Sequence, residues 1–253
     1  MPKILLTILS IACILLTGCG GGSSSSPSTT SGGSTSSGGT SGSTGTPTPN
    51  AFAGTYNGSG YSSAGTVGPA AMVIDNEGYL LGSMAIANGS SALSATFSCK
   101  VPDTGTTSLL ITNANKTQEL DTATFSFDAA RHLIVTFTTF SGSNVKLRLS
   151  SSGQALQYAG SFSGTSTASG VIGALAFAVG SAGDLTGTLT IPSTGAIYAL
   201  SGNVTRAGAV SWTAARVGYL PESWTGYVGY DGSDQMIANI SRSDGAVMSA
   251  TLN

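Results

Sequence analysis

Hydrophobic and polar residues alternate strictly in many short segments that follow residue 50. In residues 185–191, leucine and isoleucine alternate with threonine, and in residues 144–149, valine and leucine alternate with asparagine, lysine and arginine. A period of two residues puts every second side chain on the same face of a β-strand. These segments are therefore predicted to be strands with one buried face. Pairs such as Asp231-Gly232 and Asp244-Gly245 separate them and are typical of hairpin turns.

The alternating pattern occurs twice in the chain. Gly54-Thr55-Tyr56-Asn57-Gly58 matches Gly160-Ser161-Phe162-Ser163-Gly164. Further matches are Gly82 with Gly187, Ala92-Leu93-Ser94 with Ala199-Leu200-Ser201, Phe127-Asp128 with Tyr230-Asp231, Ile134 with Ile237, Gly142 with Gly245, and Leu149 with Leu252. The shift between these matched residues stays between 103 and 107. So steady a shift indicates a tandem repeat, although strands rich in Gly, Ser and Thr also align by chance.

Each copy contains about eight candidate strands, which suits a small up-and-down barrel or a sandwich because closure removes exposed strand edges. We therefore predict an all-β fold, a tandem duplication of an antiparallel meander, with copies at 51–156 and 157–253. Two separate barrels and one shared sheet are both compatible with the pattern. The buried faces are expected to match pair by pair, as Leu80 with Leu185, Met84 with Leu189, Ile86 with Ile191, Leu133 with Met236, and Val135 with Ala238.

The first hairpin of each copy resembles the first hairpin of avidin- and lipocalin-type barrels. The similarity lies in Gly54-Thr55-Tyr56-Asn57 and, in the second copy, in Asp184-Leu185-Thr186-Gly187-Thr188. Those families usually carry Trp where this chain has Tyr56 and Phe162. The resemblance is confined to this hairpin, so it favours a barrel and transfers no ligand.

The first residues have a different character. Lys3 precedes an apolar segment, Ile4–Leu16, that is too short to span a bilayer comfortably and is typical of a signal peptide. It ends in Leu16-Thr17-Gly18-Cys19, which resembles the lipobox of bacterial lipoproteins. The resemblance implies a signal peptide at 1–18, cleavage between Gly18 and Cys19, and diacylglycerol and an N-acyl chain covalently attached to Cys19. An ordinary cleaved signal with a coincidental cysteine is the alternative.

The residue after the lipobox cysteine bears on location. In bacterial lipoproteins an Asp there favours retention in the inner membrane, so Gly20 implies the outer membrane. Residues 20–50 are mostly Gly, Ser and Thr with three prolines, a composition that offers little to bury and predicts disorder. Residues 19–50 are thus expected to form a lipidated, flexible tether whose root-mean-square span is roughly 30 Å.

Candidate chemistry is sparse. A nucleophile–His–acid triad must use His132, the single histidine. Because Leu133 and Val135 are expected to face inward, His132 is predicted to point outward as a solvated residue. Once Cys13 is removed and Cys19 is lipidated, Cys99 is the remaining cysteine, predicted to be a shielded core thiol. The chain has no His-Glu-x-x-His motif or cysteine pair at zinc spacing, so no catalytic residue, metal site or cofactor is predicted.

Acidic and aromatic clusters offer two further candidates. The turns Asp75–Gly78 and Asp231–Asp234 supply too few oxygens for a dedicated calcium site. A possible ligand platform comprises Tyr61, Tyr79, Tyr219, Trp224, Tyr227 and Tyr230. Within it, Trp224 and Tyr230 are expected to be core residues instead. Charged residues are only 8% of the chain and its net charge is −2, so no nucleic acid partner is predicted.

The sequence thus predicts an outer-membrane lipoprotein that presents a non-enzymatic β-module for binding, adhesion or envelope interaction. The membrane is the expected partner through the lipid anchor, on either the periplasmic or the outer face. A protein or small-ligand partner is also expected, and the sequence does not identify it. The alternatives are a calycin-like barrel that binds a small apolar ligand and a hydrolytic enzyme.

Overall fold

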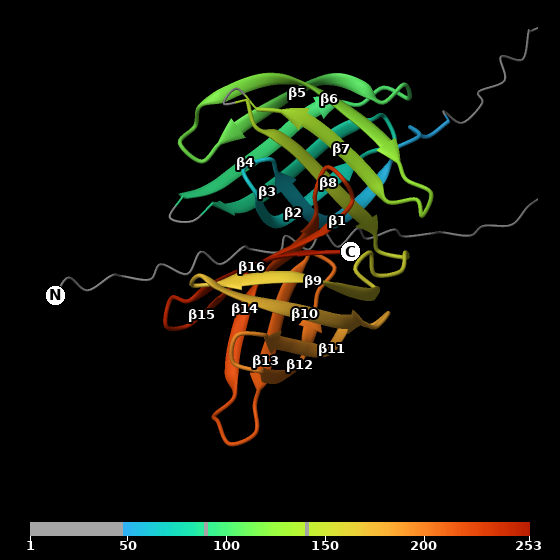
Figure 1. The fold of residues 1–253 in the computed structure, drawn as a ribbon. Helices are drawn as coiled ribbons and strands as arrows, with labels where there is room; N and C mark the ends of the chain where they lie inside the picture. Colours follow the sequence, from blue (N-terminus) through green and yellow to red (C-terminus); the bar gives the residue numbers. More distant parts are fainter. Residues whose placement is uncertain (1–47, 89–90, 140–141) are drawn as a thin grey trace, which may run out of the picture. The chain divides into compact units, whose positions relative to one another are not determined.

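The computed structural model describes residues 48–88, 91–139 and 142–253. These residues form sixteen β-strands and no helix (Figure 1). Accordingly, these ranges contain no helix with the length and apolar character needed to cross a membrane. The predicted cleavage and lipidation residues, Gly18 and Cys19, lie outside the described ranges, as does the predicted tether up to residue 47. The lipoprotein assignment therefore stays a prediction.

The first eight strands form a closed antiparallel barrel in which each strand pairs with the next and β8 pairs with β1. The strands are β1 (Gly54–Ser62), β2 (Thr66–Ile74), β3 (Tyr79–Asn88), β4 (Ser91–Lys100), β5 (Thr106–Asn113), β6 (Gln118–Phe127), β7 (Leu133–Thr138) and β8 (Asn144–Ser151). Because the ring is closed, no edge of this sheet is left unpaired.

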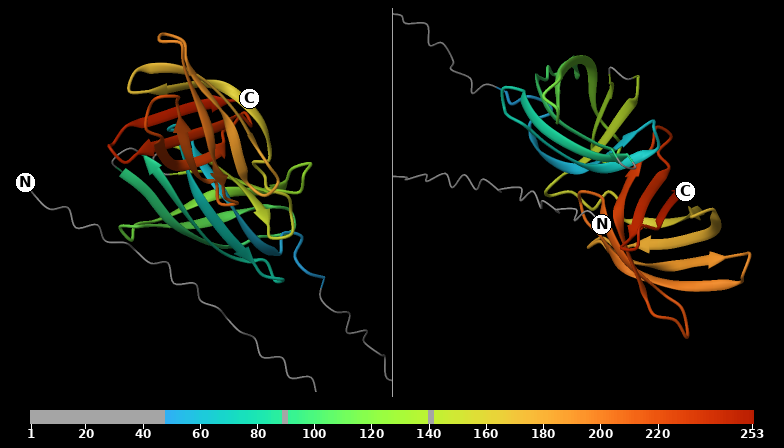
Figure 2. Two further views of the ribbon diagram at one scale, coloured as in Figure 1. Left: turned by 90° about the horizontal axis from the view of Figure 1, so that it is seen from below. Right: turned by 90° about the vertical axis from the view of Figure 1, so that its left-hand side faces the viewer.

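The last eight strands form a second closed antiparallel barrel, in which β16 pairs with β9 (Figures 1 and 2). The strands are β9 (Gly160–Ala168), β10 (Val171–Val179), β11 (Asp184–Ile191), β12 (Ala196–Val204), β13 (Ala209–Ala215), β14 (Glu222–Tyr230), β15 (Met236–Arg242) and β16 (Val247–Leu252). The predicted all-β duplication of an eight-strand meander is confirmed, and each copy closes as a separate barrel.

The strand register shows how closely the copies correspond. Gly54 is paired with Ile74 between β1 and β2, just as Gly160 is paired with Val179 between β9 and β10. One sequence match is wrong, however. Gly82 is paired with Phe97 and Gly187 with Leu200, so Phe97, not Leu93, is the structural equivalent of Leu200. The two alignments differ by four residues, an even number, so both put Leu200 on the same face and the alternating pattern cannot separate them.

The interior of each barrel is filled with apolar side chains. Of the inner-face pairs predicted, all but one residue are buried, while Ile191 is only partly buried and packs against the second core. Gly187 is crowded, since a Cβ there would lie 2.3 Å from the Ala176 carbonyl oxygen and 2.5 Å from the Cβ of Phe177. Its counterpart Gly82 has more space, with the Ala71 carbonyl oxygen nearest at 3.1 Å. Alternation thus predicted correctly which side chains build the two cores.

The folded part begins slightly earlier than the predicted tether boundary. The backbone N–H of Asn50 donates to the Asn76 carbonyl oxygen at 2.9 Å, and its side-chain Nδ2 donates to the Val101 carbonyl oxygen at 2.8 Å. Asn50 is therefore held by the first barrel. The sequence did not predict this attachment, because an asparagine next to prolines is as typical of a flexible linker as of a folded segment.

Candidate functional site

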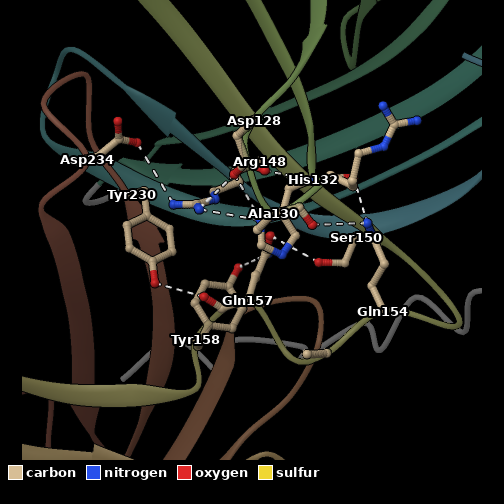
Figure 3. Close-up of polar contacts among 12 residues, drawn as sticks. Asp128, Ala130, His132, Arg148, Ser150, Gln154, Gln157, Tyr158, Tyr230 and Asp234 are labelled. Carbon is tan, nitrogen blue, oxygen red and sulfur yellow. Dashed lines mark hydrogen bonds and ion pairs between the residues drawn. The ribbon is translucent and has the colours of Figure 1, made fainter.

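Three places bring together side chains that could act on a partner: the contact between the two barrels, a groove beside it, and the open end of the second barrel. The described residues of both barrels belong to one compact unit. The contact between barrels centres on Tyr158, which lies in the connection between β8 and β9 and is fully buried. Its hydroxyl donates to Ser59 Oγ at 2.8 Å. It also accepts from Gln157 Nε2 at 2.7 Å, and Gln157 and Tyr158 are both labelled in Figure 3.

Tyr230 joins the same contact from β14. Its ring stacks on Tyr158 with centroids 5.9 Å apart, and its hydroxyl donates to the Gln157 carbonyl oxygen at 2.8 Å. The Arg148 guanidinium of β8 lies over the Tyr230 ring, 4.4 Å from its centroid. Burial raises the pKa of both tyrosines, so both hydroxyls stay protonated and able to donate at neutral pH.

A group of charged residues surrounds the tyrosines. Asp128 Oδ2 accepts from Arg148 at 2.8 Å and lies 2.9 Å from His132 Nδ1 (Figure 3). Across the contact, Lys146 Nζ donates to Asp234 Oδ1 at 2.7 Å. Burial raises the pKa of Asp128, but hydrogen bonds from His132 and the charge of Arg148 outweigh it and hold that pKa below its usual value. Asp128 is therefore an ionised anchor for both basic groups.

The predicted outward, solvated position of His132 is wrong, because the side chain is buried. His132 precedes β7 and belongs to a turn closed by Asp128, whose Oδ1 accepts the His132 backbone N–H at 2.8 Å. Gln154, from the connection between the barrels, donates to the Arg131 carbonyl oxygen at 2.6 Å and so lies against this turn. The alternation of inward and outward side chains holds within β7 but does not predict the burial of a residue in the turn before it, which contacts from the connection between the barrels cover.

The cluster around His132 offers little chemistry. In the described part of the chain, the side-chain hydrogen bonds of His132 go to Asp128 and Arg148, and none joins it to a hydroxyl or thiol. A nucleophile would need such a bond to lose its proton to the imidazole. The geometry instead suits a polar contact that holds the two barrels against each other.

The other sequence candidates lie apart from this cluster. Cys99 is partly buried against the first core, and burial raises the pKa of its thiol to about 11. The carboxylates of Asp75 and Asp231 accept backbone N–H groups within their own turns. No group of three or more His, Cys, Asp or Glu able to hold a metal occurs among the described residues. Trp224 and Tyr230 are buried in the second core, as predicted.

A groove of about 620 Å³ runs beside the contact between the barrels. Its walls include Thr122, Thr124, Thr136 and Thr138 from the outer face of the first barrel, and Lys146. That lysine is already paired with Asp234. The groove is thus lined mainly by hydroxyls. Its other charged residue is Asp231, whose Oδ1 accepts backbone N–H groups of its own turn.

The open end of the second barrel differs from the rest of the surface. Its four hairpins connect β9 to β10, β11 to β12, β13 to β14, and β15 to β16. All the large exposed hydrophobic residues described in the second barrel lie on or next to these hairpins. We call them the rim, and they are Val171, Ile172, Ile197, Val217, Tyr219, Leu220 and Val247. In Figure 1, the longest of these hairpins is the orange loop between β13 and β14.

A hollow of about 380 Å³ lies at the same end of the barrel, and one rim residue, Val171, lines it. Apolar side chains form most of its wall, among them Leu189, Ile191, Trp224 and Met248. Ser166 lies at its edge and is buried, with Oγ donating to the Gly173 carbonyl oxygen at 3.3 Å. The volume falls within the range of roughly 300–1,000 Å³ typical of small-molecule sites.

Two arginines line the hollow in different states. Arg242 is fully engaged: it contacts Glu222 and Asp244 at 2.6 Å each and lies over the Trp224 ring. Hydrogen bonding to Arg242 lowers the pKa of Asp244 to about 2. Arg216 lies over the rings of Tyr198 and Tyr219, at 6.0 and 4.5 Å from their centroids. Among the described residues no carboxylate pairs with Arg216, so it is the cation at this end that can bind an added anion.

The first barrel provides an internal comparison. Its described hairpins at the equivalent end join β1 to β2 through Ser63-Ala64-Gly65 and β5 to β6 through Ala114-Asn115-Lys116-Thr117. These residues are polar or small, whereas the β13–β14 hairpin carries Val217, Tyr219 and Leu220. Because both barrels have the same fold and these two hairpins carry no large apolar residue, closing a barrel does not require an apolar hairpin such as β13–β14. The rim is therefore a functional candidate rather than a consequence of the architecture.

The sequence contained one signal for the rim. Arg216-Val217-Gly218-Tyr219-Leu220-Pro221 is a turn segment by its Gly and Pro, yet three of its residues are large and apolar. The aromatic residues proposed as one ligand platform do not form one, since Tyr79 and Tyr219 belong to different barrels. The remaining rim residues lie at strand ends, where alternation predicts only an outward side chain and gives no indication that they gather at one end.

Comparisons with known proteins add little. No protein-family model matches the chain, and no curated protein matches it. Among solved structures, it is similar to a protein of unknown function from the DUF3598 family of Nostoc punctiforme. The identity is 11%, the alignment covers 80% of this chain and 96% of that chain, and the TM-score is 0.23. A similarity this low carries no information on function.

Proposed function

We propose that this protein is an outer-membrane lipoprotein whose duplicated β-barrels form a non-enzymatic binding module, with the open end of the second barrel as its binding site. The gathering of all seven rim residues at the end of the barrel that also bears an apolar hollow is the observation that carries the proposal. Exposed apolar surface of this kind is kept where it contacts a partner. The site therefore binds an apolar group, while Arg216 accommodates an adjacent negative charge.

A small apolar ligand of the kind held by calycin barrels is the second candidate. The volume of the hollow and its apolar wall favour it. The filled interior opposes a deep ligand, because buried side chains such as Phe177 and Trp212 occupy the space below. A ligand would thus sit in the mouth of the barrel rather than inside it.

An environment-sensitive dye, 1-anilinonaphthalene-8-sulfonate, tests the binding site. Its apolar rings and sulfonate suit the hollow and Arg216, so we expect enhanced fluorescence with the folded chain. Ala246→Phe, at the edge of the hollow, should reduce dye binding several-fold by filling it. Ala64→Phe, on an exposed hairpin of the first barrel, is the matched control and should change nothing. Equal dye binding by both variants would remove the site from the second barrel.

Anchoring is tested separately. Cys19→Ala should abolish incorporation of labelled palmitate, since the lipobox resemblance assigns the acylated thiol to Cys19 alone. The variant should also be absent from the membrane fraction, because it lacks the acyl chains that stable attachment needs. Labelled palmitate on the variant, together with unchanged fractionation, would refute the lipoprotein assignment.

A further inference from the structure

The rim suits one kind of partner in particular, and we propose that it docks on the lipid bilayer to which the chain is anchored. This inference rests on the anchoring proposed above. It names the occupant of the same site, so that the open end of the second barrel becomes a membrane-facing surface with its hairpin tips among the lipid headgroups and upper acyl chains.

The positions of the apolar side chains carry the argument. The rim extends over all four hairpins, and its β13–β14 members project furthest into solvent: Val217 is 99% exposed and Leu220 is 89% exposed. A ligand confined to the hollow would leave these two side chains in water. A bilayer surface covers hairpin tips and hollow together, and this burial of apolar surface drives interfacial binding.

The polar groups at the rim fit the same surface. Tyr219 combines an apolar ring with a hydroxyl, the type of residue enriched at membrane–water interfaces. Arg216 lies against that ring and has no carboxylate partner among the described residues, so its guanidinium is free to bind a lipid phosphate. The second arginine, Arg242, is already compensated by Glu222 and Asp244, so it brings no uncompensated charge to the interface.

Because the predicted tether already holds the barrels near the bilayer, the rim needs only a weak affinity for lipid to orient the second barrel. Thirty residues, 20–49, separate the predicted lipidated cysteine from Asn50, which the first barrel holds, and a flexible chain of that length spans roughly 30 Å. Holding the barrels this close to the lipid raises the effective concentration of the bilayer at the rim. A few apolar side chains then bias the orientation of the second barrel, although the anchor supplies most of the affinity.

Nitroxide depth measurements on the full, lipidated chain test this proposal. In a Cys99→Ala background, Val217→Cys and Leu220→Cys carry the label at the rim. Ala64→Cys and Asn115→Cys carry it on the equivalent hairpins of the first barrel, where both residues are exposed. The protein is reconstituted in vesicles of phosphatidylethanolamine with a minority of phosphatidylglycerol. Collision with oxygen and with a water-soluble nickel chelate reports whether each label is in lipid or in water.

We expect labels 217 and 220 to gain accessibility to oxygen and lose accessibility to nickel, several-fold relative to labels 64 and 115. The first-barrel labels share the anchor and tether, so they control for mere proximity to the vesicle. Equal nickel accessibility at all four positions would overturn the proposal. So would loss of accessibility to both reagents at 217 and 220, which indicates a protein partner. If the dye still binds the hollow in either case, the proposed binding site stands and only its occupant is wrong.

Discussion

Asp128 and Asp231 occupy equivalent turns of the two barrels but have different surroundings. Each uses Oδ1 to accept the backbone N–H four residues ahead, from His132 and Gln235 respectively. Oδ2 of Asp128 additionally contacts His132 and Arg148. The two aspartates therefore share the same backbone role, while, among the described residues, only the one in the first copy also forms an ion pair at the contact between barrels.

This difference predicts a pH dependence of stability. The pKa of Asp128 is lower in the folded chain than in the unfolded chain, where a carboxyl titrates near about 3.9. Below that value the unfolded state binds more protons, so the stability contributed by Asp128 is present above about pH 4 and is lost as the pH falls through the folded-state pKa. Asp128→Asn should lower the free energy of unfolding at pH 7 and flatten its decline below pH 4, as measured by urea denaturation across pH.

Asp121 provides a control of opposite sign. Burial and then the charge of Glu119 raise its pKa, so ionisation of Asp121 opposes folding at neutral pH. Asp121→Asn should therefore leave stability at pH 7 unchanged or increase it. Similar losses in both variants would show that removing either carboxylate simply damages the first barrel.

At the scale of elements, the turn after the second strand repeats closely between the two barrels. Gly78 follows β2 and Gly183 follows β10, with φ of +86° and +100°. The carbonyl oxygen of each glycine accepts a backbone hydrogen bond at 2.8 Å from a valine at a strand end: Val101, just after β4, and Val204, the last residue of β12. In both barrels the glycine of this turn therefore lies against the same position of the neighbouring strand at the same distance, which leaves no room for a side chain.

Alanine substitutions test this equivalence. In Gly78→Ala and Gly183→Ala the new Cβ would lie 2.5 and 2.4 Å from the carbonyl oxygens of Val101 and Val204. The left-handed backbone adds a cost of about 1–3 kcal/mol for a residue with a side chain. We expect similar destabilisation in both variants, measured by thermal unfolding. Gly232→Ala has open space around it and should be near neutral, and a large cost there would point to turn entropy instead of crowding.

At the scale of the whole molecule, the two barrels share buried polar contacts. Tyr158 bonds to Ser59 of the first barrel and stacks on Tyr230 of the second. The arginine of the β12–β13 turn, Arg206, donates to the carbonyl oxygens of Ser151, at the end of β8, and of Gln154 in the connection. Because these groups are satisfied only when both barrels are folded, their stabilities are coupled.

Tyr158→Phe tests this coupling. Losing the hydroxyl removes the hydrogen-bond partner of Ser59 Oγ and of Gln157 Nε2, which costs about 1–3 kcal/mol. Both tryptophans, Trp212 and Trp224, lie in the second barrel, so tryptophan fluorescence reports that barrel while far-ultraviolet circular dichroism reports both. We expect the two urea transitions to coincide in the natural chain and to separate in the variant. The exposed Tyr219→Phe is the control, and an equal loss of stability there would exclude a specific role for the Tyr158 hydroxyl.

The sequence by itself determined the strands, their buried faces and the duplication. Alternation with a period of two is a local property, so Leu80, Leu185 and their neighbours could be assigned to a core without knowing what they pack against. Turn residues such as Asp231 and Gly232 marked the strand ends for equally local reasons. The separate closure of each copy was not local, since it depends on whether β8 pairs with β1 or with β9.

The candidate site was decided by the tertiary structure. Strand closure gathers Ile172, Ile197 and Val217, which are far apart in the sequence, at one end of a barrel. The burial of His132 arises in the same way, from contacts that the connection between barrels makes with its turn. Alternation specifies which face a side chain occupies, whereas a rim or an interface depends on which ends and turns of many strands meet in space.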